Sequence, residues 1–590
     1  MLSILLKSVG ITLIGFGMIA CGGGGGGDTT SLQTAGTASV ASNDIMVAQS
    51  PNTAEPTQLP EVTAVVPSLD LNKPLTSTSV TEDVITTSIE GLAYTNVDTN
   101  NVKNIWNSNT FVNVGTNIRY VAPRCKSSAD VNAICGRISN TGLTVDSPWD
   151  LMSTAGGDQN VPSDTIVWML PGDYSHPDND YAGPTADMTR INFTLSGEYN
   201  KPIHFRPLPG LYVGANKGVR INGGIEMNSS WVWIWEVEMT AIQPKVAQND
   251  NAIVEYELMD WRPATSPLSP FEYYFDTSSY DELHALAPMR MEAFVVYSDN
   301  SKLVNVISHR TAQGSGVWGV AKDFEQHGSI LYDNGWSDQD RVHGHGIYTQ
   351  NGTKTKRIFS DNIIAGNMGN GMQIYASSEH PEMLNDFEII GNVWFAQRLN
   401  SGNGIKISAE TSTNIHFEDN FIAGYGVVYP YVATPEYTAS PKPELFNRTC
   451  ENNRMYETMS YGYDCGSMTN LKIKRTDSST EYSVLRPNKY DPRRANLMVF
   501  NPEQKTTVAI DLANFAKTGD RIVIYNSLNM KEPLEYGIYN GENATITWPT
   551  HTKWKIADIP WTYFDTDFAK SQEGNLEKEF WAFVVFNMGQ

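Results

Sequence analysis

The sequence predicts an all-β protein, with a parallel β-helix in the middle of the chain and a β-sandwich at the C-terminus. Three observations carry this prediction. A Gly-x-Gly motif followed by a short apolar strand recurs in the middle of the chain, an Asn-containing element recurs between its copies, and residues 491–590 alternate in polarity between turn residues. The repeats show no helical periodicity, so short strands that stack coil upon coil are expected.

The central repeats are regularly spaced. The copies "GSGVW", "GHGIY", "GNGMQ" and "GNGIK" begin at residues 314, 344, 369 and 402, and between them lie "FSDNIIAGN" (359–367), "IIGNVWFAQ" (389–397) and "FEDNFIAGY" (417–425). Like positions in a β-helix stack about 4.8 Å apart. Asn362, Asn392 and Asn420 are therefore predicted to form a column whose side-chain amides hydrogen-bond along the stack. The glycines are predicted to supply positive φ or a close backbone approach at another corner.

The N-terminus has the features of a targeting signal. Lys7 precedes the apolar run "SVGITLIGFGMIA", and "MIAC" resembles a bacterial lipobox, which implies that Cys21 is lipidated. Residues 1–20 are predicted to be a lipoprotein signal peptide and residues 21–84, rich in Gly, Ser, Thr and Pro, a flexible tether. An ordinary signal peptide is the alternative. The expected location is the outer membrane or cell surface, on its periplasmic or extracellular face.

The charge of the chain restricts its partners. A formal net charge of -23 and a pI near 4.8 argue against non-specific nucleic-acid binding, which needs a basic surface. An acidic substrate would need a local basic patch. The expected partners are a polysaccharide and, through the lipid, a membrane, and the expected oligomeric state is a monomer.

The remaining cysteines form two close pairs. Cys125 with Cys135 and Cys450 with Cys465 are the expected disulfides in an oxidising compartment. Neither spacing is the C-x-x-C of a zinc knuckle, so a structural zinc site is not favoured.

The region before the repeats resembles the opening of the bacterial right-handed parallel β-helix proteins of the pectate-lyase-like superfold. The segments "RYVAP", "DTIVWMLPGDY" and "SGEYNKPIHFRPLPG" occur in the order seen there, and with the repeats the resemblance covers about residues 119–426. It implies a right-handed β-helix that acts on polysaccharides. The chain lacks the aspartate trio and the Arg-x-Pro-x-x-Arg signature of calcium pectate lyases, so pectate is not a favoured substrate.

Domain boundaries follow from changes in composition. The β-helix is predicted over residues 85–490, with insertions at 241–290 and 427–490, and the C-terminal β-sandwich over 491–590. Long insertions on solenoids commonly build the binding cleft.

One outward column of the repeats is the first candidate site. Alternation puts Ile405 and Ile407 inside, so Lys406 faces outward, and the repeats predict the outward neighbours Gln373, Tyr348 and Trp318. Aromatic faces at this spacing can pack on successive sugar rings, and Gln or Lys can contact hydroxyls or carboxylates. Ordinary packing beneath the flanking loops is the alternative.

A second candidate is the loop "WSDQDRVHGH" at residues 336–345, the densest mixture of acidic, basic and imidazole groups in the chain. It contributes Asp338, Asp340, Arg341, His343 and His345. The following "TKTKR" adds a basic cluster, namely Lys354, Lys356 and Arg357.

Three reactions suit these residues. Elimination from a uronate needs a cation at the carboxylate and a base for the C5 proton. Arg341, Lys406 and Lys354 are the candidate cations, and His343, His345, Tyr348 or a lysine the candidate bases. Hydrolysis needs two carboxyl groups, for which the candidates are Asp338, Asp340, Glu379 and Glu410.

The third possibility is a metal site. His343 and His345 are expected on one face of a strand and could join Asp338 or Asp340, and the two aspartates alone could bind Ca²⁺ or cap a turn. No other cofactor is indicated.

The sequence thus predicts a lipid-anchored enzyme that cleaves a uronate-containing polysaccharide by β-elimination. The alternatives are a glycoside hydrolase, a C5 epimerase, which shares the proton-abstraction step, and a non-catalytic glycan-binding or adhesive surface protein.

Overall fold

The computed structural model describes most of the predicted β-helix and sandwich. The described residues are 72–78, 84–85, 87–89, 117–125, 134–175, 190–208, 218–240, 292–337, 342–367, 369–375, 383–395, 405–408, 414–423, 428–431, 448–456, 471–473, 482–549 and 579–589. Almost all of their regular structure is β-strand. No helix of these residues is long and apolar enough to cross a membrane.

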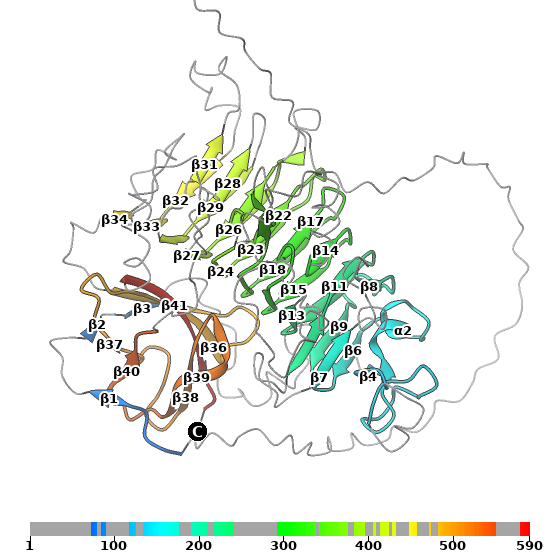
Figure 1. The fold of residues 1–590 in the computed structure, drawn as a ribbon, viewed down its shortest axis with the longest axis horizontal. Coiled ribbons are helices and arrows are strands. Elements are labelled where there is room, and N and C mark those ends of the chain that lie inside the picture. The colour runs from blue at the N-terminus through cyan, green and yellow to red at the C-terminus, as the bar shows by residue number, and fades with distance from the viewer. Residues whose placement is uncertain are drawn as a thin grey trace, which may run out of the picture. The chain divides into compact units, whose positions relative to one another are not determined.

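The middle of the chain is a right-handed parallel β-helix. Each coil passes through three parallel sheets in turn, for example through β22, β23 and β24 (Figure 1). Sheet I contains β8 (Arg190–Phe193), β11 (Gly224–Met227), β14 (Phe294–Val296), β17 (Ser315–Val317), β22 (Ile347–Thr349), β25 (Met372–Ile374), β28 (Ile405–Ser408) and β31 (Val428–Tyr431).

Sheets II and III complete each coil. Sheet II contains β5 (Trp149–Asp150), β4 (Asn117–Ala122), β6 (Thr165–Met169), β9 (Ile203–Pro207), β12 (Val232–Trp235), β15 (Lys302–Val304), β18 (Phe324–His327), β23 (Arg357–Ser360), β26 (Phe387–Ile390), β29 (Ile415–Glu418) and β32 (Arg448–Glu451). Sheet III contains β7 (Gly172–Ser175), β10 (Val219–Asn222), β13 (Glu238–Thr240), β16 (Ile307–His309), β19 (Ile330–Tyr332), β24 (Ile363–Ala365), β27 (Val393–Phe395), β30 (Phe421–Ala423), β33 (Arg454–Tyr456) and β34 (Leu471–Ile473).

The turn from sheet II to sheet III contains the predicted asparagine column. Its first residue is left-handed in successive coils, as at Asp361 (φ 52°) and Asp419 (φ 55°). The second is the buried asparagine: the Nδ2 of Asn362 donates to the Oδ1 of Asn392 at 2.9 Å, and that of Asn392 to Asn420 at 3.2 Å. The column is confirmed, and it continues to Asn453.

Close backbone approach explains one glycine in each of two copies of the repeated motif. A Cβ on Gly346, the second glycine of its copy, would lie 2.5 Å from the carbonyl oxygen of Gly371, and one on Gly314, the first glycine of its copy, would lie 2.4 Å from that of Gly346. Gly344, the first glycine of its copy, instead has a positive φ of 72°. Both physical reasons predicted for the glycines therefore occur, at different positions.

The N-terminal end of the β-helix core is closed by α2 (Leu151–Ala155). The side chain of Asp150 caps this helix by accepting from the backbone N–H of Ser153 at 3.0 Å. Leu151 and Ala155 pack into the main core cluster. The short helix therefore covers apolar side chains that the first coil would otherwise expose.

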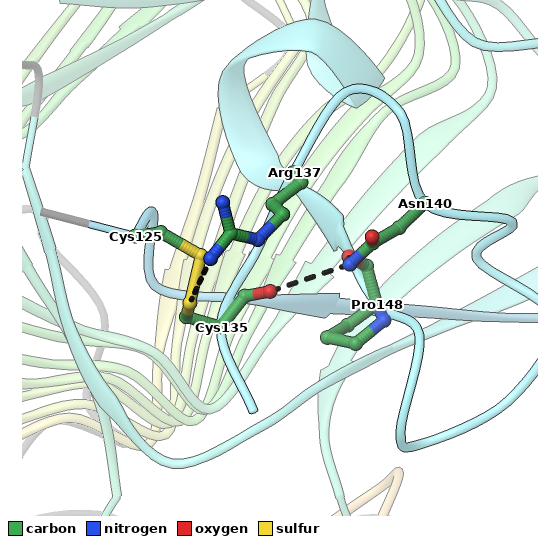
Figure 2. The surroundings of a disulfide bond; sticks show 5 residues. All are labelled: Cys125, Cys135, Arg137, Asn140 and Pro148. Atoms are coloured by element: carbon green, nitrogen blue, oxygen red, sulfur yellow. Dashed lines mark hydrogen bonds between the residues drawn. A yellow bond between two sulfur atoms is a disulfide. The ribbon is translucent and has the colours of Figure 1, made fainter. Parts of the chain in front are cut away.

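The expected disulfide between Cys125 and Cys135 is confirmed (Figure 2). Beside it, the Nδ2 of Asn140 donates to the carbonyl oxygens of Cys135 and Pro148, at 3.4 and 2.7 Å. Cys450 is also disulfide-bonded. Its expected partner, Cys465, lies outside the described residues.

The C-terminal domain is a β-sandwich whose two sheets include strands from the N-terminal part of the chain (Figure 1). Sheet IV contains β3 (Thr87–Ile89), β35 (Tyr482–Pro487), β36 (Arg494–Phe500), β41 (Phe580–Asn587), β38 (Arg521–Asn526) and β39 (Asn529–Ile538). Sheet V contains β1 (Ser77–Thr78), β40 (Asn543–Thr547), β37 (Thr507–Ile510) and β2 (Val84–Ile85).

Because of these strands, the domain boundaries differ from the expected ones. Residues 77–78 and 84–85, at and near the end of the expected tether, pair with β40 and β37, and β35 enters the sandwich before residue 491. The segment 427–490, expected as an insertion, adds β31, β32, β33 and β34 to the three sheets of the β-helix. The asparagine column also continues there, to Asn453. The other expected insertion, 241–290, lies outside the described residues.

Candidate functional site

The outer face of sheet I carries the candidate site. Ile347 and Met372 are buried in the core, so Tyr348 and Gln373, which follow them, point outward and are half-buried. The backbone register aligns Tyr348 with Gln373 and Gln373 with Lys406, as the repeats predict.

Trp318 occupies a different register from the predicted one. Gly316, not Trp318, is aligned with Tyr348. The "GSGVW" copy is displaced by two residues because Ser315 pairs with Ile347, which brings Gly314 against Gly346. Trp318 therefore lies just beyond the end of β17.

Three aromatic rings nevertheless come together at this face. The ring of Trp318 is stacked on that of Tyr297, with centroids 6.3 Å apart, and is tilted against that of Tyr348 at 5.5 Å. Tyr297, Trp318 and Tyr348 belong to successive coils. Rings repeated at this interval can contact successive pyranose units of a chain.

The expected basic cluster is divided between three environments. Lys354 is exposed, and Lys356 is paired with Glu388. Arg357 is fully buried: it donates to the carbonyl oxygen of Ala321 at 2.6 Å and to that of Trp318 at 3.4 Å. Burial lowers the pKa of Arg357 to about 9. Arg357 thus holds the turn that carries Trp318 and is not a surface cation.

Two glutamates share one arginine next to the rings. Nη1 of Arg190 lies 3.4 Å from a carboxyl oxygen of Glu226, and its Nη2 lies 3.5 Å from one of Glu292. Gln313 donates to the other oxygen of Glu292 at 3.1 Å, and Asn228 to the other oxygen of Glu226 at 2.8 Å. The side chains of Arg190, Glu226 and Glu292 are 35%, 29% and 24% exposed, so all three are largely buried but still reach solvent.

Burial changes the acidity of several groups here. The pKa of Glu292 is raised by burial and by the charge of Glu226, although Arg190 opposes the shift. Burial is also the main reason that the pKa of Tyr297 is raised and that of Tyr348 reaches about 12. Glu292 is therefore suited to carry a proton, and both phenols remain protonated at neutral pH.

His345 has a structural partner. Its Nδ1 accepts the backbone N–H of Asn370 at 2.8 Å, so in the neutral ring the proton is on Nε2. The ring also lies against Tyr348, with centroids 5.8 Å apart. Gly369 is required beneath it, because a Cβ there would lie 2.5 Å from Nδ1 of His345.

The two histidines of the "HGH" motif lie on different elements. His343 is in β21 (Val342–His343), which pairs with β20 (Trp336–Ser337) in an antiparallel hairpin. His345 follows that hairpin and precedes β22. The two histidines therefore do not belong to one strand, and the expectation of a shared strand face is not tested because the side chain of His343 lies outside the described residues.

Several predicted site residues cannot be placed. Asp338, Asp340, Arg341, Glu379 and Glu410 lie outside the described residues, as do the side chains of His343 and Lys406. In the described parts of the chain, no three His, Cys, Asp or Glu side chains form a group that could hold a metal ion.

Sequence reasoning missed Arg190, Glu226 and Glu292. Glu226 could have been found, because it lies between the apolar residues Ile225 and Met227 and must face outward. Glu292 gives no such signal, since it precedes its strand and follows the long segment 241–291.

Comparisons with known proteins find distant structural similarities but no related family. No family model matches the chain, and no match was found among curated proteins. Similar solved structures include a pectate lyase, at 15% identity over 60% of this chain and 72% of that chain, with a TM-score of 0.31. Others are a lacto-N-biosidase from Eubacterium ramulus (8% identity, 61% and 67% coverage, TM-score 0.30) and a surface adhesin of Streptococcus pneumoniae (10%, 51% and 68%, 0.26).

Proposed function

We propose that this protein binds a polysaccharide along the outer face of sheet I and hydrolyses it with Glu226 and Glu292. The supporting observation is the pair of carboxyl groups on one arginine, beside three aromatic rings from successive coils. Glycoside hydrolysis uses two carboxyl groups in different roles. Aromatic rings supply the contact with the apolar faces of sugars.

In this proposal Glu292 is the acid. Its raised pKa favours the protonated form, which can donate to the oxygen of the leaving sugar. Glu226, held by Asn228 and Arg190, would act as the carboxylate that attacks the anomeric carbon or activates a water. Arg190 would keep the two groups in place.

The local charge also supports hydrolysis. Arg190, the cation of this cluster, already contacts both carboxyl groups. With Glu292 protonated, the remaining carboxylate, Glu226, already pairs with Arg190 and opposes the binding of an added uronate at short range. A neutral sugar meets no such repulsion.

Elimination is the second candidate, because the register aligns Lys406 with Gln373 and Gln373 with Tyr348. A lysine there could neutralise a uronate, and the Tyr348 phenol could donate a proton. Incubation of the purified protein with neutral and uronate polysaccharides separates the reactions. Hydrolysis gives reducing ends without the absorbance of an unsaturated uronate; that absorbance would replace our proposal with elimination, and binding without cleavage would indicate an adhesin.

We also propose that a lipid on Cys21 anchors the protein to the outer membrane or cell surface, where it works as a monomer. The "MIAC" motif and the composition of the following segment support the anchor. Replacing Cys21 by Ser should move the protein from the membrane fraction to the soluble fraction and abolish labelling by a fatty acid. Unchanged fractionation and labelling would contradict this proposal.

A further inference from the structure

A second pair of aromatic rings lies outside the cluster of Glu226 and Glu292. Tyr199, 76% exposed, meets Trp231 edge to face, with ring centroids 5.5 Å apart and planes at 80°. Trp231 lies in the turn from sheet I to sheet II, directly before β12. The pair therefore stands at the edge of sheet I and not on its face.

The backbone at Trp231 disfavours a tryptophan. Its φ is 57°, a left-handed conformation that bulky residues rarely adopt. Five other described coils have a left-handed Asn or Asp at the same register position, namely Asp164, Asn300, Asp323, Asp386 and Asn414. Pro202 and Lys356, at this position in two further coils, are not left-handed. Trp231 thus departs from the residue type that this turn favours, and a gain other than local stability has to explain it.

The hairpin that contains Gly197 and Tyr199 packs against the backbone of Trp231. Gly197 donates its backbone N–H to the carbonyl oxygen of Ser230 at 2.9 Å. A Cβ on Gly197 would lie 2.8 Å from the carbonyl oxygen of Trp231, so glycine permits this approach. The hairpin thereby holds Tyr199 beside Trp231.

The hairpin that contains Tyr199 also carries an exposed ion pair. Glu198 and Lys201 form an ion pair of 3.7 Å at the base of the hairpin, with side chains 66% and 58% exposed. Perpendicular ring faces next to exposed donors and acceptors match a sugar, which has apolar C–H faces and a rim of hydroxyl groups.

We propose that Tyr199 and Trp231 form an accessory glycan-binding site, separate from the site of cleavage. Trp231 follows Asn228, which holds Glu226, by three residues. A polysaccharide bound at this edge is thus held next to the carboxyl pair. The inference is independent of which reaction the carboxyl groups perform.

The test is Trp231→Asn, made in the Glu292→Gln background so that no probe is consumed. Because Asn suits the left-handed turn, this variant should be at least as thermally stable as its parent. The probe is xylan, galactan, alginate or polygalacturonate, whichever retards the parent most in affinity electrophoresis, and we expect the affinity of Trp231→Asn for it to fall about tenfold. Tyr199→Ala should weaken the same interaction, and Trp231→Phe, which keeps a ring, should weaken it less.

Unchanged retardation of Trp231→Asn, or a parent that none of the four polysaccharides retards, would overturn the accessory site. Failure of the proposed hydrolysis has a different signature. In that case no cleavage is seen in the wild-type protein, while Trp231→Asn still weakens binding.

Discussion

At the scale of single residues, buried asparagines specify the corner between sheets II and III. Each one accepts from the asparagine of the preceding coil and donates to the next, as Asn392 does between Asn362 and Asn420. Asn392 also donates to the carbonyl oxygen of Phe359 at 2.8 Å. The side chain satisfies backbone and amide groups that have no access to water.

Replacing Asn392 by Ala should therefore destabilise the β-helix. The backbone and side-chain donors of Asn362 would lose their acceptor, at a cost of about 2 kcal/mol. Thermal unfolding measures the change. The exposed Asn192, replaced by Ala, is the control and should change stability by less than about 0.5 kcal/mol; equal effects of the two substitutions would contradict the role of the column.

The unusual histidine of the repeated motif, His345, has a structural role. The other copies of the motif have Ser315, Asn370 and Asn403 at this position. The imidazole accepts the backbone N–H of Asn370 in the next coil, which orders the turn before β25. The sequence marked this residue as unusual, but only the contact with the next coil shows what it does.

At the scale of elements, the N-terminal strands stabilise the C-terminal sandwich. Leu75, before β1, is buried in the sandwich core cluster and donates its backbone N–H to Ile538 at 2.9 Å. Thr545 in turn donates to the carbonyl oxygen of Thr76. The end of the expected tether is thus part of the folded domain.

Leu75→Ala should lower the free energy of unfolding of the sandwich by about 2–4 kcal/mol, because it removes a buried side chain from a packed core. Thr76→Ala, at an exposed neighbouring position, should cost about 0.5 kcal/mol. Chemical unfolding followed by tryptophan fluorescence compares them. If Leu75→Ala proves no more harmful than Thr76→Ala, the segment does not belong to the sandwich core.

The register of the elements separates what the sequence could predict from what it could not. The repeats with regular spacing predicted the asparagine column and the alignment of Tyr348, Gln373 and Lys406. They misplaced Trp318 by two residues, because the corresponding positions of two similar motifs need not be aligned in neighbouring strands. Glu226 and Glu292 both contact Arg190, although the three residues belong to different coils of unequal length. A local sequence pattern contains no information about which residues of different coils lie close together.

At the scale of the whole molecule, a buried polar network joins the β-helix to the sandwich. The hydroxyl of Tyr490 donates to Glu325 at 2.7 Å, and Lys302 and Lys489 also bind Glu325. Nε2 of His327 accepts the backbone N–H of Lys489 at 3.1 Å. The packing of the β-helix against the sandwich therefore depends on the charge states of residues from both domains.

The stability of this junction should depend on the proton of His327. Burial lowers its pKa to about 4, although Asp361 and Glu325 favour the charged ring. The unfolded chain takes up this proton near pH 6.5, so His327 makes the folded state less stable as the pH falls from about 6.5 to about 4. The full effect is about 3 kcal/mol.

Other groups titrate in the same range, so a variant must isolate this effect. Glu236, whose pKa is raised by burial to about 7, acts in the opposite direction, because its protonation favours the folded state between pH 4.5 and 7. His327→Gln retains an acceptor for Lys489 and has no proton to gain. We expect its loss of stability between pH 6.5 and pH 4 to be smaller than that of the wild type; parallel curves would contradict the assignment.

The central claim is that Glu292 acts as the acid in the cleavage of a polysaccharide on sheet I. Its most direct test is the rate at which reducing ends appear from a cleaved polysaccharide, compared between the wild type and Glu292→Gln. We expect the rate to fall by about 10²–10⁴-fold with binding retained, whereas Glu388→Gln on sheet II, a half-buried carboxylate paired with Lys356, should keep the wild-type rate. A Glu292→Gln variant that is as active as the wild type would contradict the account.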